Sequence, residues 1–318
     1  MSFKDIKGQD KSIQLLQAYA SQSRIAGAYL FIGPEGLGKN LAAKTLAKAL
    51  NCEVNTLDSC DKCGSCLKIE KNQHPDVHII NDDSDAVKIE EIRQLQKELS
   101  LKPYEGRHKV FIINNAHNLT PEAGNALLKT LEEPPKYSTI ILVSSKPAVL
   151  FKTIISRCQV LKFYPLARPE LKEILKNEYG LDSHLAHFLA YFCEGRLGSA
   201  LKLKETDIAR EKNRVIDEFA VAGRLRLENF SIKSRDDARE ILYILAAWFR
   251  DAYLIKVGIP QAELINFDRR NDLLRFMNRF SFIELDNVLN SISDGLLQLE
   301  QNINVKLLLS NLKWSLQA

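Results

Sequence analysis

The sequence predicts an α/β domain built on a parallel sheet, followed by a region made only of helices. Two observations carry this prediction. Up to about residue 165, short apolar runs alternate with segments of helical periodicity, as in a sheet covered by helices on both faces. Beyond about residue 165, runs of strand type disappear and helical periodicity continues. With 318 residues, the chain is long enough for two or three domains.

The composition is that of a globular protein and excludes several other classes. Hydrophobic residues make up 45% and charged residues 26%, so extensive disorder is excluded. The net charge of +4 is too small to argue for nucleic-acid binding without a clustered basic face. The longest clean apolar run, 241–249, is shorter than the ~18 residues of a membrane span. Because the first residues carry no export signal, we expect a cytoplasmic protein with no membrane partner.

Five short apolar runs are the expected strands of the sheet. They are Ala28–Ile32, Val77–Ile80, Val110–Ile113, Ile140–Val143 and Val160–Phe163. Runs this short and this apolar are typical of strands that are buried on both faces. The sequence therefore predicts a parallel sheet rather than a hairpin sheet with one solvated face.

Helical segments separate these runs and continue after them. In the first half we expect helices over 41–50 and 88–99, and a third that begins at Thr120, a capping residue followed by a first-turn proline. In the second half we expect helices over 169–179, 185–192, 241–253 and 305–316. Trp248 and Phe249 fall on one of these helices and are expected to be core residues.

These patterns divide the chain into three parts. We expect an α/β domain over residues 1–165, a small helical domain over 166–210 and a helical carboxy-terminal domain over 211–318. The first boundary is placed where the strand patterns end. The second boundary rests only on the charged run Lys202–Arg214.

The segment after the first predicted strand is close to a phosphate-binding loop. It reads Gly33-Pro-Glu-Gly36-Leu-Gly38-Lys39-Asn40. In such loops glycines let backbone amides surround phosphates, the lysine reaches the terminal phosphates, and a final Ser or Thr ligates magnesium. Asn40 replaces that hydroxyl residue, so metal positioning is compromised while ATP or ADP binding is left open. The alternative is a chance match of this pattern on an ordinary loop.

The residues after the third predicted strand also depart from what ATP hydrolysis requires. Nucleotide hydrolases of this type place a carboxylate there to hold magnesium, and often a second to polarise the attacking water. Both positions are asparagine here, Asn114 and Asn115. An amide cannot act as a base and is a weak substitute for a carboxylate beside a cation. We therefore expect no intrinsic ATPase activity.

Four of the six cysteines lie within one short segment, at Cys52, Cys60, Cys63 and Cys66. Four soft ligands at this spacing suit a closed, tetrahedral, structural zinc site in a module over about 52–75. An iron–sulfur cluster is one alternative, weakened because the fourth cysteine lies upstream and no Cys-Pro follows. A redox-active pair is another, although nothing else in the chain suggests thioredoxin chemistry.

Several further motifs occur in a fixed order along the first half of the chain. They are Phe3–Gln9, Ala28–Phe31, the phosphate loop, the four cysteines, His74–Val77, Asn125–Pro135 and Ser156-Arg157-Cys158. In this combination the chain resembles the AAA+ clamp-loader family of bacterial DNA polymerase III, which includes gamma/tau and delta-prime types. In the second half, the segment 194–201 is similar to the sensor-two segment of that family. The resemblance implies an AAA+ domain over 1–165, a helical lid over 166–210 and a helical oligomerisation collar over 211–318.

The departures from the family pattern distinguish between its types. The gamma/tau type has Ser or Thr at the loop end, an Asp-Glu pair after the third strand and a sensor-two arginine. Here those places hold Asn40, the two asparagines described above and Gly198. The Ser156-Arg157-Cys158 element is retained, and in this family its arginine is presented across a subunit interface to a neighbour's ATP. This is the profile of the delta-prime type, with a surface salt bridge as the alternative role of Arg157.

The resemblance therefore implies a non-hydrolysing subunit of the DNA polymerase III holoenzyme that completes the clamp-loader ring. Arg157, with Ser156, would act in trans on the neighbouring ATPase while the sliding clamp is loaded onto primed DNA in replication. The implied partners are gamma/tau-type and delta-type subunits, together with the clamp and the primed DNA. Two rival functions are an active gamma/tau-type ATPase and a stand-alone, metal-binding nucleotide sensor.

Overall fold

The computed structural model describes residues 1–21, 25–54, 57–80, 86–218, 232, 234–301, 305 and 308. The chain divides into two compact units. The first comprises Met1–Leu166 with Arg196–Ser199, and the second comprises Ala167–Gly195 with Ala200–Ala318. The finer division of the helical region into lid and collar stays a prediction. Among the described residues, no helix combines the length and the apolar character that crossing a membrane requires.

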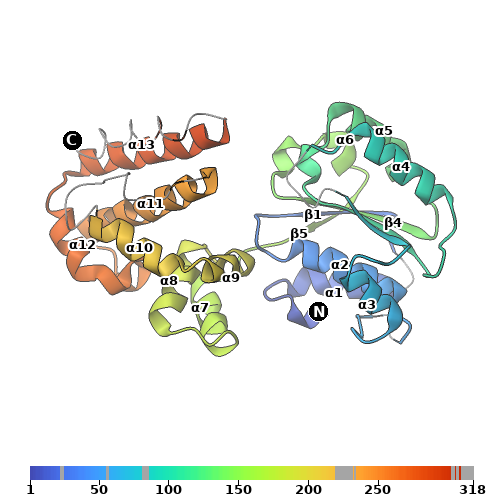
Figure 1. The fold of residues 1–318 in the computed structure, drawn as a ribbon, viewed down its shortest axis with the longest axis horizontal. Helices are drawn as coiled ribbons and strands as arrows, with labels where there is room; N and C mark the ends of the chain where they lie inside the picture. Colours follow the sequence, from blue (N-terminus) through green and yellow to red (C-terminus); the bar gives the residue numbers. More distant parts are fainter. Residues whose placement is uncertain are drawn as a thin grey trace. The chain divides into compact units, whose positions relative to one another are not determined.

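The first unit is built on a five-stranded parallel sheet (Figure 1). Across the sheet, its strands are β2 (Val77–Ile80), β3 (Lys109–Ile113), β4 (Ser138–Ser144), β1 (Ala28–Ile32) and β5 (Gln159–Lys162). Every neighbouring pair is parallel, and Leu30 in the central part of β1 faces Leu142 on β4 and Val160 on β5. The predicted parallel sheet of AAA+ type is therefore confirmed.

Helices cover both faces of this sheet (Figure 1). One face carries α1 (Asp10–Ser21), α2 (Lys39–Asn51) and α3 (Gly64–Glu70), and the other carries α4 (Ile89–Ser100), α5 (Pro121–Glu132) and α6 (Lys152–Ile155). Because side chains alternate along a strand, neighbouring residues enter two separate cores. Phe31 shares a core with Leu46 of α2, whereas Leu30 shares the opposite core with Leu127 of α5.

Helix α5 begins as its sequence predicts. The Thr120 hydroxyl oxygen accepts a hydrogen bond from the Ala123 N–H at 3.3 Å, and Pro121 occupies the first turn. This cap satisfies a backbone donor that has no partner within the helix. The sequence did not predict α1, α3 or α6.

The second unit is helical where the structure describes it. Its helices are α7 (Arg168–Asn177), α8 (Ser183–Phe192), α10 (Ile208–Ile216), α11 (Arg235–Val257), α12 (Arg270–Met277) and α13 (Phe282–Glu300). Two short turns, η6 (Gln261–Glu263) and η7 (Phe267–Arg269), precede α12, and α9 (Leu197–Glu205) has residues in both units. The predicted helices over 169–179, 185–192 and 241–253 are confirmed, and the one over 305–316 lies outside the described residues except for 305 and 308.

An aromatic core holds α11 and α12 together. Trp248 and Phe249 of α11 are buried and meet the Phe276 ring of α12 edge to face, with ring centroids 5.7 and 5.4 Å apart. Such pairs add to the stabilisation that comes from the burial of the rings. The prediction that Trp248 and Phe249 are core residues is therefore confirmed.

Candidate functional site

Three strand ends bring the candidate nucleotide site together. The strands β3, β4 and β1 are parallel neighbours, so their carboxyl ends meet at one edge of the sheet. Asn114 follows β3, Ser144 ends β4 and Gly33 follows β1, where its N–H donates to the Ser144 carbonyl at 3.3 Å. The structure therefore places the phosphate loop beside the polar strand ends that the sequence singled out.

The phosphate loop is closed on its own lysine. Lys39 is only 6% exposed, and its Nζ donates to the carbonyl oxygens of Gly33 and Pro34, both at 2.6 Å. Burial lowers the pKa of Lys39 to about 8, although the Glu35 carboxylate acts in the opposite direction. The ammonium group is therefore bound to backbone oxygens of the loop in this structure.

The first turn of α9 covers the same loop. The Gly198 N–H donates to the Gly36 carbonyl at 2.8 Å. A Cβ atom at Gly198 would lie 2.9 Å from that carbonyl oxygen, and one at Gly36 would lie 2.3 Å from Oγ of Ser199. Both distances are too short for real contacts, so two glycines permit this approach of backbone to backbone. The glycine at the expected place of the sensor-two arginine is the residue that lets α9 rest on the loop.

Among the described residues, the positions at the end of the loop and after β3, where catalysis would need a hydroxyl or a carboxylate, hold asparagines. Asn40 is exposed in the first turn of α2, Asn114 is buried, and Asn115 has a left-handed φ of 48°. His117 lies with its Nδ1 3.4 Å from the Ser144 hydroxyl, and burial lowers the pKa of this imidazole. Burial thus favours the neutral imidazole, which lies within hydrogen-bond distance of the end of β4.

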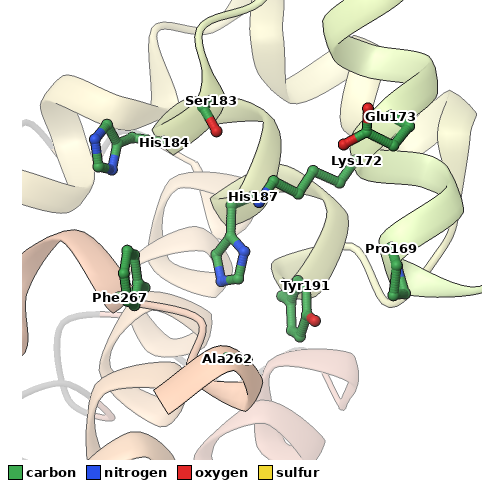
Figure 2. A pocket seen from close by; sticks show the side chains of 9 residues that line it. All are labelled: Pro169, Lys172, Glu173, Ser183, His184, His187, Tyr191, Ala262 and Phe267. Atoms are coloured by element: carbon green, nitrogen blue, oxygen red, sulfur yellow. The ribbon is translucent and has the colours of Figure 1, made fainter.

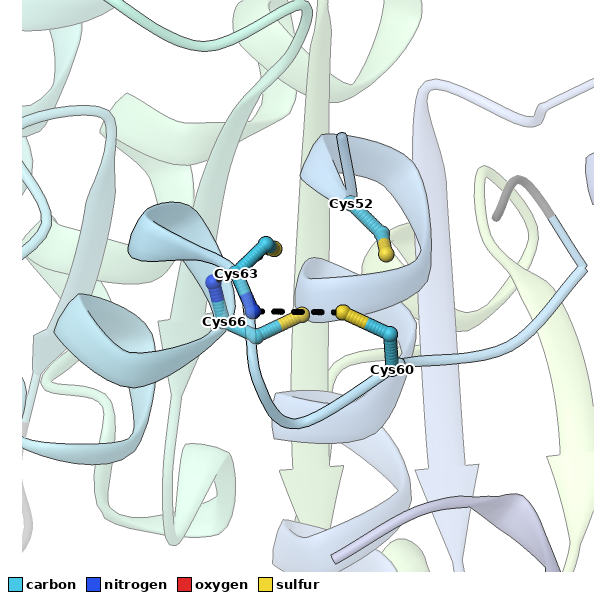
Figure 3. Close-up of side chains that lie close together, drawn as sticks. All are labelled: Cys52, Cys60, Cys63 and Cys66. Carbon is cyan, nitrogen blue, oxygen red and sulfur yellow. Dashed lines mark hydrogen bonds between the residues drawn. The ribbon is translucent and has the colours of Figure 1, made fainter. Parts of the chain in front are cut away.

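The four cysteines of the predicted metal site come together in space (Figure 3). Their Sγ atoms all lie within 4.8 Å of one another, and none of the four is in a disulfide. In a tetrahedral site with Zn–S bonds of about 2.3 Å, the sulfur atoms are about 3.8 Å apart. The cluster therefore fits a metal ion held by four thiolates, with only small movements of the side chains.

Local backbone structure stabilises thiolates at this cluster. Cys52 follows the last residue of α2, while Cys63 is the N-cap of α3 and Cys66 lies in the first turn of α3. The Cys63 N–H donates to Sγ of Cys60 at 3.3 Å, and the Cys66 N–H donates to Sγ of Cys63 at 3.5 Å. Backbone hydrogen bonds from Lys62 and Cys63 lower the pKa of Cys60 to about 6. These donors and the amino end of α3 favour negative charge on sulfur.

A charged contact joins this module to α2. Lys48 is only 2% exposed, and its Nζ donates to two carboxylates of the module, Asp61 at 2.7 Å and Glu70. The two carboxylates raise the pKa of Lys48 and more than offset the effect of its burial. The sequence did not reveal this contact, because Lys48 resembles any solvated lysine of an amphipathic helix.

Arg157 lies apart from the phosphate loop, on the other face of the sheet. It follows α6, whose Ile154 is fully buried in the core beneath α5, whereas α2 packs in the opposite core. The guanidinium is about one third exposed and contacts Glu132, the last residue of α5. The Ser156 hydroxyl donates to the Thr153 carbonyl at 3.1 Å. The structure thus presents an accessible arginine on a firmly anchored turn.

A cavity of about 370 Å³ lies in the second unit, and none of its lining residues was a candidate site residue in the sequence. Its lining residues are Pro169, Lys172, Glu173, Ser183, His184, His187, Tyr191, Ala262 and Phe267. Figure 2 shows the His187 ring between those of Phe267 and Tyr191, with centroids 5.8 and 4.3 Å away. Nε2 of His187 lies 2.7 Å from the Leu264 carbonyl oxygen, and burial lowers the pKa of this histidine. A neutral His187 therefore donates this bond and connects α8 to the loop between η6 and η7.

The family models that match this chain and the curated relatives given below are described as DNA polymerase III subunits. Residues 8–167 match the family described as DNA polymerase III, delta subunit, and residues 214–315 match the family described as DNA polymerase III, delta subunit, C terminal. The delta' subunit of DNA polymerase III from Bacillus subtilis (strain 168) is 31% identical over 97% of this chain and 96% of its own length. This chain belongs to the clamp-loader subunit family of DNA polymerase III.

Other relatives of this clamp-loader subunit match about two thirds of its length. The tau subunits from Bacillus subtilis (strain 168) and Escherichia coli (strain K12) are 41% and 38% identical over 65% of the chain, but the match spans only 38% and 33% of their lengths. Among solved structures, a gamma subunit-related protein from Thermotoga maritima has a TM-score of 0.51 at 18% identity. The match covers 96% of this chain and 98% of that protein, which supports the fold.

Proposed function

We propose that this clamp-loader subunit is of the delta-prime type and that it does not hydrolyse ATP. One observation carries the proposal: the chain's own nucleotide site is altered and closed, whereas Ser156-Arg157-Cys158 is retained with an accessible arginine. The relative that is similar over nearly the whole chain, a delta' subunit, supports the same type. The protein would act in the cytoplasm, where it completes a ring with gamma/tau-type and delta-type subunits.

In this role Arg157 acts on a neighbour's ATP. Negative charge redistributes over the γ-phosphoryl oxygens during transfer, and a guanidinium placed there stabilises the transition state. The group needs no nucleotide in its own subunit. Its planar fork can donate two parallel hydrogen bonds to one phosphoryl group, which a lysine cannot do. The ring would use this hydrolysis to load the sliding clamp onto primed DNA.

The closed phosphate loop has a consequence for nucleotide binding. ATP or ADP could occupy the loop only after Lys39 releases the Gly33 and Pro34 carbonyls. The contact between Gly198 and Gly36 would also have to open. Each step breaks hydrogen bonds that the empty loop already makes, so we expect weak binding of either nucleotide.

We propose zinc as the structural metal of the cysteine cluster. Cys52, Cys60, Cys63 and Cys66 would hold it in a closed tetrahedron with no position left for substrate. The ion would order a module that has little core of its own. It would also fix the segment that follows α2.

An active gamma/tau-type ATPase is the second candidate function, favoured by the 41% identity to a tau subunit over 65% of the chain. Three replaced positions oppose it, namely Asn40, Asn114 and Asn115. The two candidates differ in where hydrolysis takes place, so an ATPase measurement on the separate chain distinguishes them.

The test combines the purified chain with its gamma/tau-type and delta-type partners. We expect no magnesium-dependent ATPase activity from the chain alone, and assembly into a complex that hydrolyses ATP and loads clamps. Lys39→Ala in this chain should leave the complex's ATPase unchanged, whereas the matching lysine substitution in the gamma/tau-type partner should abolish it. Turnover by the chain alone that Lys39→Ala removes would contradict the proposal and favour the gamma/tau type.

A further inference from the structure

The guanidinium of Arg157 is bound on two sides by groups of its own chain. Its Nε donates to Oε1 of Glu132 at 2.7 Å, and its Nη2 contacts the same oxygen. On the other side of the guanidinium, Nη1 donates to the Thr153 carbonyl at 3.0 Å and lies 3.4 Å from the Ser156 hydroxyl oxygen. One carboxylate oxygen thus binds Nε and Nη2 on one side of the guanidinium, and one backbone carbonyl binds Nη1 on the other.

These contacts leave a defined part of the guanidinium for another ligand. An arginine side chain has five N–H donors, one on Nε and two on each terminal nitrogen. Glu132 engages Nε and Nη2, and Thr153 engages Nη1. Each terminal nitrogen has a second N–H, and the one on Nη1 makes only the long contact with Ser156. These two N–H groups can form the forked contact that a phosphoryl group accepts. The long contact with Ser156 is the weakest of the set and the first to be exchanged.

The two residues of this pair are carried on a rigid platform. Glu132 ends α5, and Arg157 follows α6, whose Ile154 is fully buried against the same core. At Gly124 of α5, a Cβ atom would lie only 2.9 Å from the Phe151 ring, so this glycine lets the segment before α6 approach α5 closely. Close packing of Phe151 and Ile154 against α5 and its core therefore holds in place the backbone segments that carry Glu132 and Arg157.

We propose that Glu132 is a positioning residue that sets the plane of the Arg157 guanidinium for a neighbouring subunit's ATP. The inference rests on the proposed trans role of Arg157 and adds a second residue to it. The pair is exposed, with Glu132 about half exposed, so it contributes little to the stability of the fold. Its contribution is to orientation: a long side chain that is already held in place loses less freedom when it meets the phosphoryl group.

A double-mutant experiment in the reconstituted clamp loader tests the proposal. The variants are Glu132→Ala, Glu132→Gln, Arg157→Ala and the double variant Glu132→Ala/Arg157→Ala, with Glu133→Ala as the matched control on the neighbouring exposed glutamate. Each complex is assayed for kcat and KM of ATP hydrolysis with clamp and primed DNA, and for the rate of clamp loading. Assembly and the thermal midpoint of each chain are checked first.

We expect Glu132→Ala to lower kcat and the loading rate with KM for ATP unchanged, because orientation matters in the transition state. A misplaced group costs up to about 10²-fold at the affected site. Glu132→Gln keeps an oxygen acceptor at the same place and should restore part of the loss. In the Arg157→Ala background Glu132→Ala should add nothing, and Glu133→Ala should match the parental complex.

Four results would overturn the inference. A parental rate for Glu132→Ala beside a defective Arg157→Ala would leave the trans role intact and remove Glu132 from it. A faster rate for Glu132→Ala would mean that the carboxylate competes with phosphate for the arginine. If Glu132→Ala lowered kcat by the same factor in the Arg157→Ala background as in the parental complex, Glu132 would act independently of Arg157. If Arg157→Ala itself keeps the parental rate, the trans role fails, and this inference fails with it.

Discussion

Lys39 and Arg157 are two cations of the same α/β unit, and both belong to motifs that contact phosphate in related folds. Lys39 is 94% buried, on the α2 face of the sheet, and its donors are taken by Gly33 and Pro34 of its own loop. Arg157 is about one third exposed and lies over the opposite core, and its guanidinium contacts the Glu132 carboxylate and the Thr153 carbonyl. The comparison shows that one unit can hold one of these cations within its own loop and leave the other accessible to solvent.

Loss of the metal should have the largest effect, and it should act on the face of the sheet that carries α2 and α3, not on the face that carries Arg157. In zinc-finger peptides a structural zinc is worth ~10–16 kcal/mol of folding free energy. We expect one zinc per chain, and its removal by a chelator should abolish hydrogen-exchange protection in α3 while strands β1 to β5 and the turn that carries Arg157 stay protected. Elemental analysis and exchange mass spectrometry provide the measurements.

Cys63→Ser should lose the metal, and Cys193→Ser, at a cysteine in the second unit, should retain it. Iron with visible charge-transfer absorbance in place of zinc would contradict the assignment.

Arg157→Ala should have the next largest effect, and only outside its own chain. Arginine fingers of GTPase systems contribute ~10³–10⁵ in rate at the site that they serve. A ring with several ATP sites loses this help at one of them, so the bulk ATPase defect should be much smaller than the defect in clamp loading. The chain's own free energy of unfolding should change by less than about 1 kcal/mol, because the pair with Glu132 is exposed.

Arg157→Lys is the control for charge, and it should rescue poorly because a point charge lacks the fork. Clamp loading at the parental rate with Arg157→Ala would show that Ser156-Arg157-Cys158 has only a structural role.

Lys39 should make the stability of the chain depend on alkaline pH. Its pKa of about 8 in the folded chain lies below the ordinary value of 10.5, so between these values the unfolded chain binds more protons. Stability therefore rises as pH increases from about 8 towards 10.5 and is insensitive to this group below about 8. Relative to Lys39→Met, the parental chain should gain about 2 kcal/mol between about pH 7 and about pH 9.5 in urea unfolding. The same slope in both chains would mean that Lys39 is not held as described.

Gly198→Ala should have the smallest effect and tests the closure of the loop directly. Its methyl group would meet the Gly36 carbonyl oxygen at 2.9 Å, so the first turn of α9 must move. We expect a loss of about 1–2 kcal/mol in unfolding free energy, at the low end of overpacking costs because a helix terminus can shift. Ser199→Ala keeps the backbone contact and should cost less than about 0.5 kcal/mol. Unchanged stability of Gly198→Ala would show that the contact is loose.

The strands and the cysteine cluster could be predicted because their signals are local. An apolar run of five residues such as Ala28–Ile32 fits a strand buried on both faces wherever it pairs, and Thr120-Pro121 satisfies the start of a helix without help from other elements. Cysteines at the spacing of Cys60, Cys63 and Cys66 can reach a common point because only two residues separate each cysteine from the next.

By itself, the sequence determined the positions of the five strands along the chain, the residue types of the phosphate loop and the presence of Arg157 in its Ser-Arg-Cys element. Only the tertiary structure decided that Lys39 turns back onto its own loop, that Gly198 closes on Gly36, and that Glu132 meets an arginine 25 positions away. These outcomes depend on which backbones approach one another, and no periodicity records that. Dihedral preferences and hydrophobic patterns act over a few residues, whereas the partner of a charged side chain is set by packing between distant segments of the chain.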